Sequence, residues 1–150
     1  FDLIIFDRYR RRGILPNEYL ENVADYVRNG GAVLVAGGPE YASADSVYRS
    51  PLGAILPAAP TARVLEEGFT PLLTDVGQRH PVTEGLPEFA MTPPLADGTP
   101  GWGRWFRLVE TVPTPTATVV MEGPDGMPLL ILDRVGAGRV ALLASDQAWL

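Results

Sequence analysis

Apolar and polar residues are patterned near the start of the chain in a way that predicts a strand, a helix and a second strand. Residues 1–6 are apolar except for Asp2, a pattern typical of a strand buried on both faces of a parallel sheet. Apolar residues then recur with helical spacing between Pro16, which suits a first helical turn, and the stop signal Gly30-Gly31. This helical stripe consists of Leu20, Val23, Ala24 and Val27. Residues 32–36 form a second apolar run, so we expect a βαβ unit.

The remaining pattern is less regular and predicts mostly short strands. The expected elements are a short helix within 41–56, a strand within 61–73, irregular structure over 77–101, and strands at 105–110 and 117–121. Two apolar runs, 129–133 and 139–144, flank the glycine-rich segment 135–138 and predict a β-hairpin. No repeat or linker divides the chain, so we interpret residues 1–150 as one α/β domain.

Composition excludes several classes of function. The chain has no cysteine and a single histidine, His80, so we predict no metal site and no disulfide. The formal net charge is −6 and every one of the 12 positive residues is arginine, which argues against a nucleic-acid partner. No apolar run reaches the length of a membrane span, and no motif for a cofactor is present. We therefore expect a soluble domain without a cofactor.

The residues that could bind a ligand lie mainly in three loops. In open α/β sheets, ligands bind beyond the carboxyl ends of the strands, and residues 7–12, 37–41 and 145–147 follow predicted strands, provided that the last strand runs parallel to the first two. From these loops we predict a pocket for a small ligand, a sugar or a carboxylate. Its candidate residues are Arg8, Arg10, Gly37, Gly38, Glu40, Tyr41, Asp146 and Gln147.

Each of these features also has a purely structural interpretation. Guanidinium groups bind carboxylate or phosphate in a bidentate fork, but four arginines within 8–12 cannot all point one way, and a solvated turn is the alternative. The pair Gly37-Gly38 completes neither a phosphate-loop nor a nucleophile-elbow motif, which favours a tight turn. For His80 we favour a hydrogen bond that fixes its loop. For Trp102, Trp105 and Trp149 we favour packing at the rim of a small core over an aromatic recognition surface.

Several of the same segments resemble the class I glutamine amidotransferase-like superfamily, with the ThuA-like and related uncharacterised branches as the nearest likeness. The resemblance rests on residues 1–6, 25–31, 32–35, 80–86 and 136–140. It implies a mostly parallel, flavodoxin-like three-layer sandwich. The sequence also resembles, more narrowly, the amidotransferase-like segment of large bacterial membrane proteins. This second resemblance implies that the chain is truncated at both ends and belongs to a membrane-anchored parent protein. The membrane anchor would then lie in segments of the parent outside residues 1–150.

The departures from that pattern imply a domain without catalysis. The family places a catalytic cysteine after the strand that corresponds to 32–36 and a histidine after the strand that corresponds to 139–144. This sequence has Gly37-Gly38 at the first place and Ser145 to Gln147 at the second. We therefore expect a binding or interaction module with an unknown protein partner or small ligand and no catalytic residue. The alternative is a hydrolase that uses Asp146 with Ser43 or Glu40.

Overall fold

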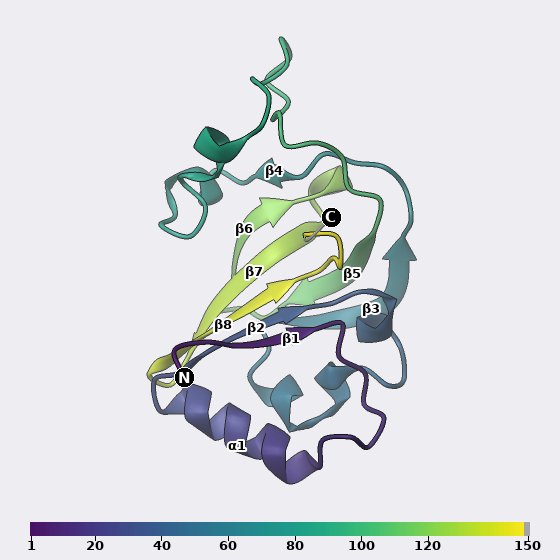
Figure 1. The fold of residues 1–150 in the computed structure, drawn as a ribbon, viewed down its shortest axis with the longest axis vertical. Helices are drawn as coiled ribbons and strands as arrows, with labels where there is room; N and C mark the ends of the chain where they lie inside the picture. Colours follow the sequence, from purple (N-terminus) through teal and green to yellow (C-terminus); the bar gives the residue numbers. More distant parts are fainter. Residues whose placement is uncertain (149–150) are drawn as a thin grey trace.

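The strands form a mixed sheet and a separate strand pair (Figure 1). The structure is a computed structural model that describes residues 1–148. Within this range six strands are ordered β1-β2-β8-β7-β6-β4, and β3 pairs with β5 alone. The strands are β1 (Ile4–Asp7), β2 (Ala32–Ala36), β3 (Ala58–Leu65), β4 (Leu72–Leu73), β5 (Leu108–Pro113), β6 (Thr118–Glu122), β7 (Pro128–Val135) and β8 (Gly138–Leu143).

The predicted βαβ unit is present at the start of the chain. Strands β1 and β2 are parallel neighbours, and the helix α1 (Asn17–Arg28) connects them. Leu20, Ala24 and Val27 of the predicted stripe are fully buried, because the helical period places them on the face that packs on the sheet. The helix ends where predicted, with Gly30 in the left-handed region at φ 114°.

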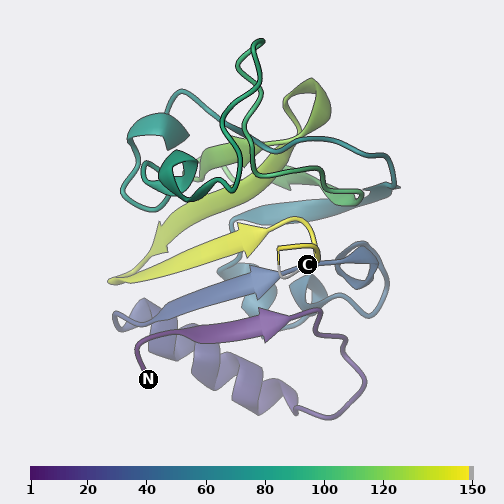
Figure 2. The same cartoon turned by 45° about the horizontal axis from the view of Figure 1, so that its top comes forward.

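The second half of the sheet departs from the predicted architecture. Strand β8 is parallel to β2, but β7, β6 and β4 each run antiparallel to their neighbours (Figure 2). The hairpin predicted around residues 135–138 joins β7 to β8, with Gly136 at φ 58°. Such short connections permit only antiparallel pairing, whereas parallel strands need long crossovers. The prediction of a mostly parallel, flavodoxin-like three-layer sandwich is therefore wrong. The described residues form a β-rich mixed sheet with one α-helix.

Short 3₁₀ turns replace the helix expected within 41–56. They span Pro39–Ala42, Val47–Arg49 and Pro51–Ala54. The side chains of Ser46 and Ser50 accept hydrogen bonds from the backbone amides of Tyr48 and Leu52, which caps the second and third turns separately. These turns and α1 cover the same face of the sheet and enclose the main core with it.

A smaller core lies on the opposite face of the sheet. Phe69, Leu108 and Met121 are among its buried members, and Trp102 and Trp105 pack against it. The indole nitrogen of Trp102 donates to the carbonyl oxygen of Pro71 at 2.9 Å. Both tryptophans therefore pack at the rim of a small core, as we expect from the sequence. Trp149 lies outside the described residues.

Strand β1 is not buried on both faces, contrary to the pattern of its residues. Phe6 is buried against α1, but Ile5 on the other face remains 49% exposed and the preceding Leu3 48% exposed. β1 forms one edge of the sheet, and the chain between β4 and β5 covers only the far half of that second face (Figures 1 and 2).

Candidate functional site

The three loops predicted to meet do meet at the carboxyl edge of β1, β2 and β8. The backbone amide of Arg8 donates to the carbonyl oxygen of Ala36 at 2.9 Å. The amide of Gly37 donates to the carbonyl oxygen of Leu143 at the same distance. These bonds extend the parallel ladder past each strand, so the loops that follow leave the sheet side by side.

Asp146 is the centre of this cluster. Its side chain is 3% exposed, and its Oδ2 accepts from Arg107 Nη1 at 2.8 Å and lies 3.3 Å from Arg8 Nε. The hydroxyl of Ser145 donates to the carbonyl oxygen of Arg107 at 2.7 Å and ties the loop to the start of β5. Arg107 is absent from the sequence-based site, because its place inside an expected strand gives no indication that it reaches the last loop.

Gly38 lies between two buried carboxylates. Its amide donates to Glu40 Oε1 at 2.7 Å. A Cβ atom on Gly38 would lie 2.8 Å from Asp146 Oδ2 and 2.9 Å from Glu40 Oε2, so only glycine permits both carboxylates to come this close. Glu40 Oε2 and Asp146 Oδ1 are buried without a hydrogen-bond partner among residues 1–148. Buried polar atoms of this kind are uncommon and mark a strained or binding-competent place.

The arginine loop encloses an open cavity of about 530 Å³ beside this cluster. Arg8, Arg10 and Arg12 line it together with the single carboxylate of Asp7. Neither Arg10 nor Arg12 forms an ion pair with any described carboxylate, whereas Arg8 is held by Asp146. Arg11 turns away from the cavity and donates to the carbonyl oxygen of Arg49 at 2.9 Å.

Arg8 has a strained backbone. Its φ of 49° lies in the left-handed region, which costs a residue other than glycine about 1 kcal/mol. The ladder bond to Ala36 on one side and the ion pair with Asp146 on the other hold it there. The fold thus fixes one guanidinium at the junction of the cavity and the carboxylate cluster.

Of the eight predicted site residues, Arg8 and Arg10 line this cavity, and the other six do not. Gly38, Glu40 and Asp146 form the cluster beside it, and the remaining three have structural roles. Tyr41 is 1% exposed in the main core, and its hydroxyl donates to the carbonyl oxygen of Ala58 at 2.7 Å. Gly37 packs against the Cβ of Tyr41, and Gln147 Oε1 accepts from the amide of Phe106 at 2.6 Å. These residues support the turn and the loop.

The buried hydroxyl of Tyr41 makes stability depend on pH. Burial, and secondarily the nearby Tyr48, raise the pKa of Tyr41 far above its ordinary value of 10.0. Stability from the protonated group is therefore present below pH 10 and lost as the pH rises above it, because only the unfolded state ionises readily. We expect Tyr41→Phe to lose about 1 kcal/mol less stability than the wild type between pH 9 and pH 11 in urea denaturation. Tyr19→Phe, at an exposed position, should leave the pH dependence of the wild type intact.

The groups of the alternative hydrolase are not arranged as a catalytic set. The hydroxyl of Ser43 donates to the backbone carbonyl of Glu40 at 2.8 Å, so it is directed at neither carboxylate side chain. His80 Nδ1 accepts from the amide of Val82 at 3.2 Å, which is the loop-fixing role that we favour from the sequence. His80 lines a separate groove on the second face of the sheet.

Solved structures with the same fold exist, although no protein-family model and no curated protein matches the sequence. The chain matches the cytoplasmic protein STM1381 from Salmonella typhimurium LT2 with a TM-score of 0.73 and 22% identity, over 100% of this chain and 62% of that one. It matches the cytoplasmic protein STM3548 from Salmonella typhimurium with a TM-score of 0.74 and 22% identity, over 97% and 61%. A β-galactosidase from Bacillus circulans sp. alkalophilus matches with a TM-score of 0.61 and 14% identity, over 97% and 20%. These likenesses show the fold alone.

These matches overturn the family resemblance drawn from the sequence. The two Salmonella proteins, which match the chain along its length, are not named as class I glutamine amidotransferases, and no family model supports that assignment. The motifs that suggested it lie largely in β1, α1 and β2, and a βαβ unit is shared by many folds. The chain spans about 60% of the length of the two Salmonella proteins.

The membrane-anchored parent that the resemblance implies has no support. No helix within residues 1–148 is long and apolar enough to cross a bilayer. The two Salmonella neighbours are named as cytoplasmic proteins, and nothing among the matches supports a membrane-anchored parent.

Proposed function

We propose that this domain binds a small anionic ligand, a carboxylate such as a sugar acid, in the cavity of the arginine loop. The observation that carries the proposal is the cavity itself, which is lined by three arginines and one aspartate, and two of the three arginines have no ion-pair partner among the described residues. In a chain with a net charge of −6, this local excess of positive charge needs a counter-charge.

The chemistry of the lining favours a carboxylate over a neutral ligand. Guanidinium groups present paired donors that match the two oxygens of a carboxylate. Arg8 is already oriented by Asp146, so less side-chain entropy is lost when a ligand binds. The half-buried Tyr9 and the apolar Ile14 also line the cavity and suit the less polar part of such a ligand.

We further propose that the domain binds this ligand without converting it. The two buried carboxylates beside the cavity serve structural roles: Asp146 holds two arginines, and Glu40 accepts the amide of Gly38. Asp7 is the single carboxylate among the lining residues, whereas acid–base hydrolysis generally uses a pair of groups, one to take a proton and one to deliver it. Binding alone requires only the charges already in place.

The experiment is a calorimetric titration with galacturonate, with galactose and inorganic phosphate as comparison ligands. Galactose is included because several proteins that share the fold are β-galactosidases. We expect galacturonate to bind, galactose to bind weakly or not at all, and Arg10→Ala to weaken galacturonate at least about tenfold through loss of one charged hydrogen bond. Arg8→Ala should weaken it further.

The matched control is Arg28→Ala, at the end of α1 on the opposite edge of the sheet. Arg28 pairs only with the exposed Asp25 at 2.8 Å, so its loss should change neither the affinity nor, by more than about 0.5 kcal/mol, the stability. If galacturonate binds wild type and Arg10→Ala equally, or if no carboxylate binds, the proposed function is wrong.

A further inference from the structure

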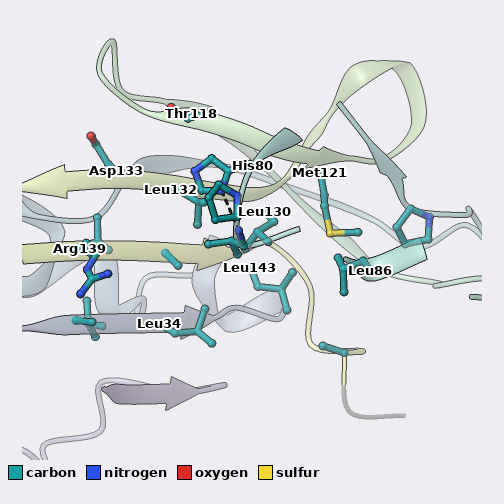
Figure 3. Close-up of a pocket in the computed structure, with 18 of the residues that line it drawn as sticks. Leu34, His80, Leu86, Thr118, Met121, Leu130, Leu132, Asp133, Arg139 and Leu143 are labelled. Atoms are coloured by element: carbon teal, nitrogen blue, oxygen red, sulfur yellow. Dashed lines mark hydrogen bonds between the residues drawn. The ribbon is translucent and has the colours of Figure 1, made fainter. Parts of the chain in front are cut away.

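The second face of the sheet carries a long apolar groove that the proposed ligand site does not use. Its volume is about 1340 Å³, beyond the roughly 300–1,000 Å³ of most small-molecule sites. The floor is apolar, and His80 and Leu86 stand on the wall formed by the chain between β4 and β5 (Figure 3). The side chains of the floor come from β2, β6, β7 and β8: Leu34, Met121, Leu130, Leu132 and Leu143.

This groove is the place where a second helical layer belongs. Parallel strands with apolar residues on both faces are normally covered by helices on both faces. Here α1 covers one face of β1, β2 and β8, while Ile5 of β1 and the floor residues lie on the other. The 12 residues of α1 span the strands on its own face, so a helix of similar length matches the opposite face.

One end of the groove carries an unusual pair of positive charges. Arg134 of β7 and Arg139 of β8 lie directly opposite each other in the antiparallel ladder, and both line the groove. Like charges at such a position repel each other. Neither forms an ion pair with a carboxylate in the part of the chain that the structure describes.

The adjacent Asp133 does not neutralise these arginines. Its Oδ1 accepts from the backbone amide of Arg134 at 2.8 Å. Its Oδ2 accepts from the hydroxyls of Thr114 at 3.1 Å and Thr116 at 2.7 Å. Both oxygens are thus engaged, so the two guanidinium groups remain available to an external anion. Figure 3 shows Arg139 toward one end of the groove.

We propose that the groove binds an amphipathic α-helix of a protein partner, with its apolar stripe on the leucine floor and glutamate or aspartate in its last turn against Arg134 and Arg139. In this proposal the partner helix runs in the direction of α1. Helix α1 ends at the amino edge, where its Arg28 carbonyl accepts from Ala137 of the β7–β8 hairpin. A helix that runs the same way on the opposite face places its negative C-terminal end at the two arginines.

The test uses a fluorescent synthetic peptide of about 14 residues, with leucines at helical spacing and two glutamates in its last turn. A second peptide carries lysines in place of the glutamates. By fluorescence anisotropy we expect the glutamate peptide to bind at least about tenfold more tightly than the lysine peptide. Arg139→Glu should abolish that preference, because the new carboxylate neutralises Arg134 opposite it, and Leu132→Asp should abolish binding of both peptides.

Three controls separate this proposal from its competitors. Arg63→Glu, on the separate β3–β5 pair, should leave peptide binding unchanged, and so should Arg8→Ala in the proposed ligand cavity. Circular dichroism shows whether each variant remains folded. Arg139→Glu changes an exposed residue, so the loss of preference is measurable even if Leu132→Asp unfolds.

Several outcomes would overturn the proposal. It fails if both peptides bind equally well to the wild type, or if dodecanoate binds while neither peptide does, since the groove would then be a lipid site. It also fails if sedimentation shows a wild-type dimer that Arg139→Glu disrupts, because a second copy of the chain would then occupy this face.

Discussion

Replacing Asp146 with alanine is expected to lower the free energy of unfolding by about 2–3 kcal/mol. The variant removes the carboxylate that Arg107 and Arg8 share, and Arg107 is only 30% exposed. Arg107 then keeps only the exposed Glu66, whose Oε1 lies 3.5 Å from its Nε. A partly buried guanidinium that loses its main partner costs more than the pair contributes when intact. Urea denaturation at pH 7 measures the change.

The same variant should also weaken ligand binding, because Arg8 loses the contact that fixes its position beside the cavity. The matched control is Asp25→Ala, which breaks an exposed ion pair on α1 and should cost less than about 0.5 kcal/mol. If Asp146→Ala is no more destabilising than Asp25→Ala, Asp146 does not organise the carboxyl edge.

Gly38→Ala is expected to destabilise the domain by roughly 1–3 kcal/mol through steric conflict. The new methyl group would lie within 3 Å of one oxygen of Asp146 and one of Glu40, and both side chains are buried. To make room, one carboxylate must move and give up its hydrogen bonds. Gly38 has an ordinary extended backbone, so the effect comes from the close approach of side chains.

Gly85→Ala is the matched control for that variant. Its new methyl group would meet only a ring atom of Phe89 at 3.8 Å, and the backbone of Gly85 is helical. We expect a change within about 0.5 kcal/mol, with slight stabilisation through the unfolded state. Equal thermal midpoints for Gly38→Ala and Gly85→Ala would show that the two carboxylates do not crowd Gly38.

The part of the fold that local pattern determines could be predicted from the sequence. The period of 3.6 along α1 and the glycines after it fixed the helix and the start of β2. Because the first two strands flank a helix, their parallel pairing follows, and with it the edge at which Arg8 and Gly38 meet. The prediction that Asp146 lies at the same edge as Arg8 and Gly38 required β8 to be parallel to β2. The structure confirms this parallel pairing.

The direction of the remaining strands could not be predicted in the same way. Strands β6 and β7 have apolar runs that suit either direction, and only the hairpin at Gly136 carries a local signal. The two-residue β4 is too short for any periodic pattern. Arg107 reaches Asp146 across 39 residues of chain, a separation at which a single sequence gives no pairing information.

The apolar run at residues 1–6 gave a misleading prediction for a physical reason. Its composition indicates burial on both faces, yet only the face with Phe6 is covered. The apolar pattern of a strand indicates which of its faces could pack against other elements. Ile5 is apolar, so the open face of β1 could also be covered by a further layer. The same mismatch underlies the proposed helix-binding groove.

Titration of the isotope-labelled domain with galacturonate, followed by amide chemical shifts, tests the central claim most directly. The account predicts saturable shifts confined to residues 7–14 and to the neighbouring amides of Gly38, Arg107 and Asp146, and their loss in Arg10→Ala. Saturable shifts centred instead on the groove residues of β7 and β8, or no shifts at all, would contradict it.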